Sequence, residues 1–222
     1  MAETKRRRVG RPSEQVLSRV LIVEAALALI DEHGAQGFGM RDIARSLGVR
    51  PSALYNHVEN KDDIYRGIRE LIGERITWDG LDDAPWDVAL AAWAREYRAA
   101  FAAHPPTVAL LAVMPISPTS SVSVAYDRVV HALGRGGWGR GEALNVLVAL
   151  ESFILGSALD AAAAPDMMDP GERDDVPEFS AAYREREELV RSTGASPADQ
   201  AFETGLQLIL DGLRTAAAAR VR

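Results

Sequence analysis

Residues 34–61, GAQGFGMRDIARSLGVRPSALYNHVENK, constrain the fold more than any other part of the chain. Apolar side chains at positions 40, 43, 44 and 47 follow the i, i+3, i+4, i+7 spacing of one helix face. Gly48, directly after them, can adopt the positive φ that ends a helix in a sharp turn. Pro51 then suits the first turn of another helix, where its missing N–H costs nothing. The pattern predicts two short helices joined by a tight turn.

The polar side chains of the second helix, about Pro51 to His57, suit contact with DNA. Leu54 and Val58 would anchor this helix to the core and leave its other residues outside. Arg pairs with guanine, Asn with adenine and Ser with either a base or a phosphate, whereas Tyr and His commonly reach phosphates. Across both helices and the turn between them, the predicted DNA-contacting residues are Arg41, Arg50, Pro51, Ser52, Ala53, Tyr55, Asn56 and His57.

A third helix is predicted to start at Lys61. Asn60 is a favourable N-cap, and Asp63 stands where a capping partner belongs. Lys61 at this helix N-terminus is a further candidate for phosphate contact. An ordinary helical hairpin with a solvated polar face is the alternative for the whole stretch.

The segment resembles the DNA-binding region of the TetR family of bacterial transcriptional regulators. The elements MRDIA, LGV, LYNHV and NK carry the resemblance, which covers roughly residues 18 to 70. Gly39 stands where the family usually has a capping Thr or Ser, and Gly is a weaker cap. The resemblance implies a homodimer that binds a palindromic DNA operator, usually as a repressor released by a small-molecule effector. The alternative function is a helical small-molecule-binding protein or scaffold without DNA binding.

The expected fold is all-α, with a small three-helix DNA-binding domain and a larger helical bundle for ligand binding and dimerisation. We predict a basic arm over residues 1–17, the helix-turn-helix domain over 18–62 and the bundle over 63–222. The arm carries KRRRVGR. Arg8 and Arg11 are predicted to follow the minor groove or the phosphates beside the reader, which is the name used below for the helix-turn-helix domain that contacts the DNA. A solvated tail is the alternative for this arm.

Charge is divided unevenly between the two ends of the chain. Residues 1–61 hold 10 Lys and Arg against 7 Asp and Glu, a net +3, whereas the formal total is −7. A basic reader on an acidic body directs DNA to one end of the protein. The sequence has no cysteine, which excludes disulfides and thiolate chemistry and is compatible with the cytoplasm. No run approaches the roughly 18 uninterrupted apolar residues that span a bilayer, so no membrane partner is expected.

An aromatic stripe between residues 86 and 104 is the candidate effector site, because the family's bundle usually encloses an effector. Most such stripes are core, and that alternative stays open. The predicted pocket residues are Trp93, Tyr97, Phe101, His104 and, on a later apolar helix, Asn145. A histidine in this region helps hold a drug-bound metal in tetracycline-binding members, but no second ligand is visible, so His104 as a helix-end residue is the alternative.

Two later segments, residues 140–163 and 197–217, are strongly apolar at helical spacing. The resemblance implies that they form a four-helix interface with a second subunit; packing inside one subunit is the alternative. The predicted interface residues are Leu147, Leu155, Gly156, Leu159, Phe202, Gly205, Leu206, Ile209 and Leu213. Residues 164–179 between them are acidic and proline-rich, and predict a solvated loop or a lid.

Enzyme chemistry is not expected from this sequence. Gly134–Gly139 formally matches G-x-G-x-x-G, but no strand precedes it, so it predicts a helix stop and connector. The four histidines are scattered and lack metal-ligand spacing. We therefore expect no catalytic residues, no metal and no cofactor.

Overall fold

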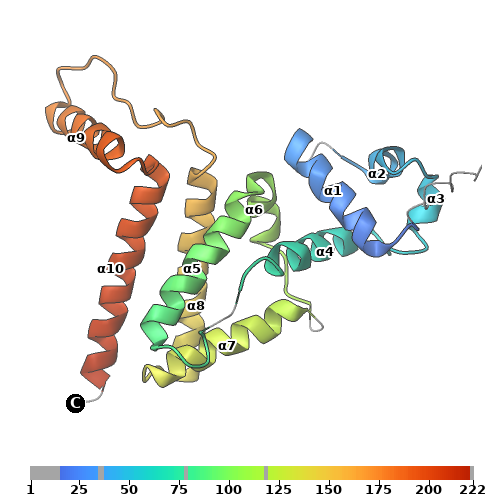
Figure 1. Ribbon diagram of the computed structural model, residues 1–222, viewed down its shortest axis with the longest axis horizontal. Coiled ribbons are helices and arrows are strands. Elements are labelled where there is room, and N and C mark those ends of the chain that lie inside the picture. The colour runs from blue at the N-terminus through green and yellow to red at the C-terminus, as the bar shows by residue number, and fades with distance from the viewer. Residues whose placement is uncertain (1–15, 35–37, 78–79, 118–119, 221–222) are drawn as a thin grey trace, which may run out of the picture.

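A computed structural model describes residues 16–34, 38–77, 80–117 and 120–220, and within these ranges the secondary structure is entirely helical (Figure 1). The all-α prediction is confirmed. The helices are α1 Arg19–His33, α2 Met40–Ser46, α3 Pro51–Leu54, α4 Lys61–Gly73, α5 Trp86–Ala102, α6 Pro105–Leu111, α7 Ser121–Arg135, α8 Arg140–Asp160, α9 Pro177–Thr193 and α10 Pro197–Arg220. Arg8 and Arg11 of the predicted arm lie outside the described residues.

Helices α1 to α4 gather at one end of an elongated molecule (Figure 1). The tight turn after α2 forms as predicted, with Gly48 at a φ of +66°. Gly39 has no side chain with which to cap α2, and its backbone N–H instead donates to Asp42 Oδ2 at 2.9 Å. The missing family Thr or Ser is therefore offset by the reciprocal half of a capping box.

Arg19 at the start of α1 fastens that helix to α4. Its Nη2 donates to Asp63 Oδ1 at 2.9 Å, and its Nη1 donates to Glu70 Oε2 at 3.3 Å. Asp63 also accepts from the backbone N–H of Glu59 at 3.2 Å, and its own N–H donates to Asn60 Oδ1 at 3.0 Å. The predicted cap of α4 is thus present, and it is shared with the packing of α1.

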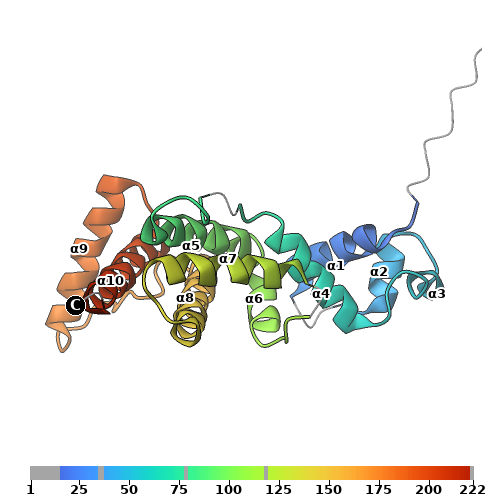
Figure 2. The same ribbon diagram turned by 90° about the horizontal axis from the view of Figure 1, so that it is seen from below.

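The larger bundle is built around α5, with α7 and α8 against it and α10 along its outer side (Figures 1 and 2). Its core continues without a break into that of the first four helices. Helix α8 has the length and apolar composition to cross a membrane, a test that core helices of globular bundles also pass. The glycine-rich connector is confirmed as a helix stop, because α7 ends at Arg135 and α8 begins at Arg140.

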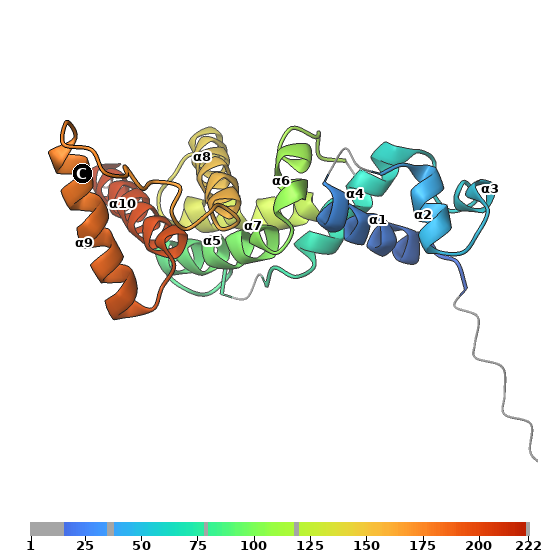
Figure 3. The same ribbon diagram turned by 90° about the horizontal axis from the view of Figure 1, so that it is seen from above.

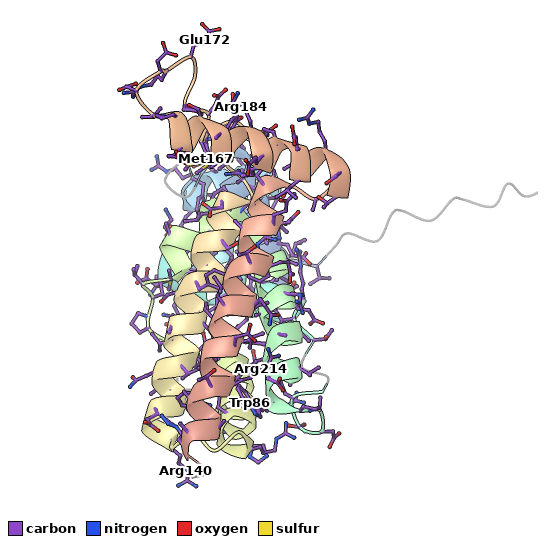
Figure 4. The ribbon with its side chains drawn as sticks, turned by 90° about the vertical axis from the view of Figure 1, so that its left-hand side faces the viewer. Trp86, Arg140, Met167, Glu172, Arg184 and Arg214 are labelled. Atoms are coloured by element: carbon purple, nitrogen blue, oxygen red, sulfur yellow. The ribbon has the colours of Figure 1, made fainter. Side chains whose placement is uncertain are left out.

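Helix α9 was not predicted from the sequence. It begins at Pro177, so the loop expected over 164–179 ends before it, and none of its residues is buried. Helix α9 lies at the opposite end of the molecule from α1 to α4 (Figure 3), and the side view shows it crossing one end of α10 (Figure 4). Apolar residues at helical spacing could not have predicted α9, because this helix does not pack against a core.

Candidate nucleic-acid interface and effector cavity

The outer surface around α3 has the exposure that DNA contact needs. Helix α3 is only one turn long, so the predicted reader helix is shorter than expected, and residues 55–57 continue it as a turn. Tyr55 is 56% exposed although it is a large aromatic residue. The exposed set comprises Arg41, Arg50, Pro51, Ser52, Tyr55, Asn56 and His57, while Ala53 is half-buried. Leu54 and Val58 are buried, which fixes this orientation.

Lys61 is held more firmly than a free phosphate-binding lysine. Its Nζ donates to the main-chain carbonyl of Phe38 at 3.0 Å and lies 4.4 Å from the centroid of the Phe38 ring. The ring of Tyr65 is 5.4 Å from the same nitrogen. The ammonium therefore ties the N-terminus of α4 to the segment before α2, and its phosphate contact stays a prediction.

A cavity of about 190 Å³ opens in the bundle between α4, α5, α7, α8 and the end of α6. A smaller lobe of about 30 Å³ shares four of its residues. The lining residues are Arg69, Tyr97, Phe101, Leu111, Ala112, Met114, Ile116, Tyr126, Glu151 and Leu155. The structure thus places Tyr97 and Phe101, two of the predicted pocket residues, at a cavity wall.

The other three predicted pocket residues lie elsewhere. Trp93 is only 1% exposed and packs in the core, where its ring centroid is 5.4 Å from that of Tyr97. Asn145 is exposed on the outer face of α8, because the inward positions of that helix are 143, 147, 150 and 154. His104 is buried at the junction of α5 and α6, outside the cavity lining.

Three polar lining residues were missed by reasoning from the sequence: Arg69, Tyr126 and Glu151. Glu151 did carry a signal, since it is an acidic residue four positions after the inward-facing Leu147. Its Oε1 accepts a hydrogen bond from the Tyr97 hydroxyl at 2.5 Å and another from the Tyr126 hydroxyl. Burial, together with the charge of Glu151, raises the pKa of both tyrosines, so the phenols keep their protons and donate them.

Arg69 joins α4 to the end of α6. Its guanidinium donates to the main-chain carbonyls of Leu111, Met114 and Pro115, the last two at 2.8 and 3.2 Å. These carbonyls belong to the C-terminal end of α6 and the segment after it, where orphan acceptors are expected. Leu111, Ala112, Met114 and Ile116 also line the cavity, so a side chain of α4 is hydrogen-bonded to the segment that forms one cavity wall.

His104 makes a second connection between the two ends of the molecule. Its Nδ1 lies 2.7 Å from Asp31 Oδ2 on α1, and its Nε2 lies 2.6 Å from Arg75 Nη1, just after α4. A guanidinium has no acceptor, so Nε2 must accept from Arg75 while Nδ1–H donates to Asp31. His104 is therefore a bridge between α1, α4 and the α5–α6 junction.

Replacing His104 with Phe is expected to lower the free energy of unfolding by about 1–3 kcal/mol, because both hydrogen bonds are lost at a buried site. Amide hydrogen exchange should quicken at the end of α1 and the start of α6. His33→Phe is the control: this histidine is exposed beside Glu32, so the change should stay within about 0.5 kcal/mol. Unchanged exchange in His104→Phe would mean that the bridge does not hold the domains together.

The residues predicted for the dimer interface differ in how far a single subunit already covers them. Leu147, Leu155, Phe202 and Leu206 are buried within a single subunit. Gly205 lets α10 approach α8 of the same subunit, since a Cβ there would lie 2.6 Å from the Phe153 ring, whereas Gly156 is exposed with open space around it. Ile209 and Leu213 are half-buried. On α8 and α10 the large apolar side chains left exposed are Leu144, Val148, Leu159 and Leu208.

Comparison with known proteins agrees with this architecture. Residues 22–68 match the family model described as bacterial regulatory proteins, tetR family, and residues 80–217 match the tetracyclin repressor-like C-terminal domain. The chain belongs to the TetR family. The tetracycline repressor protein class A from transposon 1721 of Escherichia coli is 30% identical over 195 residues, covering 86% of this chain and 88% of that protein.

Two further relatives of this regulator cover most of its length. The transcriptional repressor DrrR1 of Streptomyces coeruleorubidus is 26% identical and covers 96% of this chain and 83% of that protein. The crystal structure of a possible TetR family regulator from Streptomyces coelicolor A3(2) aligns with a TM-score of 0.68 at 27% identity, covering 90% of this chain and all of the other. The chain is thus a transcriptional regulator that binds DNA through its helix-turn-helix.

Proposed function

We propose that this regulator binds a palindromic operator as a homodimer in the cytoplasm, represses transcription there, and is released when a small molecule occupies the cavity in the bundle. The exposed polar surface around α3 carries the proposal for DNA. Two readers related by a two-fold axis must lie a whole number of DNA turns apart, each about 34 Å. Arg50 and Asn56 would read bases, whereas Tyr55 and Lys61 would contact phosphates.

The proposed domain organisation of the chain is consistent with this function. We place an arm at residues 1–17, the DNA reader at 18–62 and the ligand-binding and dimerisation body at 63–222. Helix α4 lies across the last boundary, and it packs on α1 and also meets α5 and α7. A movement of the body therefore reaches the reader through α4.

Release of DNA requires that a ligand prefers one reader separation over another. Arg69 supports such a link, because it binds the carbonyls at the cavity wall from within α4. A ligand that displaces residues 111–116 would break these hydrogen bonds and shift α4. The reader would move with it.

The proposed function is tested by selecting bound duplexes from a random DNA pool at a stated salt concentration. We expect an enriched palindrome whose half-site spacing is a multiple of one DNA turn. Arg50→Ala should change base preference by about 1–3 kcal/mol at particular positions. Tyr55→Phe should weaken all sequences alike. A pool from which nothing is enriched would favour the alternative, a helical small-molecule-binding protein.

A further inference from the structure

The cavity in the bundle is small and carries a distinctive set of hydrogen-bonding groups. At about 190 Å³ it lies below the roughly 300–1,000 Å³ typical of pockets for drug-sized ligands, so it suits a ligand with one ring. Three of its walls are the aromatic side chains of Tyr97, Phe101 and Tyr126. The rings of Tyr97 and Phe101 meet edge to face with centroids 5.0 Å apart.

The hydrogen bonds inside the cavity leave acceptors rather than donors for a ligand. Both phenol hydrogens are already donated to one oxygen of Glu151, its Oε1. Among the described residues, no hydrogen bond reaches the other oxygen, Oε2, and no arginine or lysine forms an ion pair with this carboxylate. The phenol oxygens and Oε2 can each still accept a hydrogen bond.

Arg69 does not cancel the negative charge of Glu151 directly. Both of its Nη atoms are directed at the carbonyls that follow α6. A half-buried carboxylate with two neutral donors and no ionic partner is costly unless a cation approaches it. Three aromatic residues line the same cavity, and a cation is attracted to the face of an aromatic ring.

We propose that the cavity selects a small organic cation, an aryl-alkylammonium or amidinium group, whose nitrogen donates to Glu151 Oε2 while its ring lies against Tyr97, Phe101 and Tyr126. This inference rests on the proposed effector role of the cavity, and it adds the chemical class of the effector. The positive charge would enter beside residues 111–116, whose carbonyls hold Arg69. A second cation there repels the guanidinium, which gives the ligand a way to move α4.

The test uses three probes of nearly equal shape: benzylamine, which is protonated at neutral pH, benzyl alcohol and benzoate. Binding to the full-length protein is measured by calorimetry, and the affinity for the selected operator is measured separately with and without each probe. Benzylamine is expected to bind at least about tenfold more tightly than benzyl alcohol, since a charge-assisted hydrogen bond is stronger than a neutral one. Benzoate should not bind detectably. Preference for benzoate or for the alcohol would overturn the proposal.

Glu151→Gln is expected to remove the preference for benzylamine, and Glu142→Gln is the matched control. Glu142 lies on the same helix but pairs with Arg220 at 2.8 Å, away from the cavity. Tyr126→Phe leaves the carboxylate in place and should keep the preference for benzylamine. It is the variant to measure if Glu151→Gln does not fold. A preference that survives in folded Glu151→Gln would overturn the assignment. Benzylamine that binds through Glu151 without changing operator affinity would contradict the effector role and leave the ligand class intact.

Discussion

Replacing Leu208 with Glu is expected to convert the homodimer into monomers and to weaken operator binding by at least about 100-fold. Leu208 is 69% exposed on α10, and Leu144 and Val148 on α8 are 52% and 51% exposed. Large exposed apolar side chains on α8 and α10, the two helices expected at the dimer interface, are the candidate contacts. A monomer has one reader, so it loses the 10²–10⁴-fold gain that a second linked contact provides.

The measurement combines sedimentation with operator binding at fixed salt. Val124→Glu is the control, because Val124 is similarly exposed, at 66%, but belongs to α7 and not to the two helices expected at the dimer interface. It should remain dimeric and bind normally. Leu206→Glu would be a poor test, since Leu206 is 1% exposed and the change would unfold the core. A dimer that persists in Leu208→Glu would place the interface elsewhere on the molecule.

The reader was predictable from the sequence because its determinants are local. Gly48 takes the positive φ that its place after an apolar stripe requires, and Asn60 caps α4 through the N–H of Asp63. Each feature involves residues within a few positions of one another. Helix α3 was overestimated because residues 55–57 turn instead of adding a helical turn.

The cavity was only partly predictable, because its polar groups come from distant helices. Arg69 binds carbonyls at least 42 positions later in the chain, and backbone acceptors leave no trace in a sequence. Asn145 and Glu151 are both polar residues on α8, and only helical phase relative to Leu147 and Ile154 separates the outward from the inward one. The predicted dimer interface has a related difficulty, since periodicity finds the apolar residues of α10 but not which of them the same chain already covers.

Replacing Arg69 with Met is expected to loosen the body from the reader and to lower the free energy of unfolding by about 2–4 kcal/mol, because main-chain carbonyls at the end of α6 lose a charged donor. All four tryptophans lie between residues 78 and 138, so their fluorescence follows the body. Circular dichroism follows every helix. The unfolding transition monitored by fluorescence and the one monitored by circular dichroism should coincide in the natural protein and separate in Arg69→Met.

Arg66→Met tests the same helix without that link, since Arg66 lies on α4 and forms no hydrogen bond to α6 among the described residues. Its change in stability should stay within about 0.5 kcal/mol. If Arg69 carries the signal from the cavity, Arg69→Met will also bind a ligand without the full loss of operator affinity, because coupling needs one element that both sites bias. Coincident transitions together with an intact ligand response in Arg69→Met would show that α4 receives the signal through other contacts, with the His104 bridge the next to test.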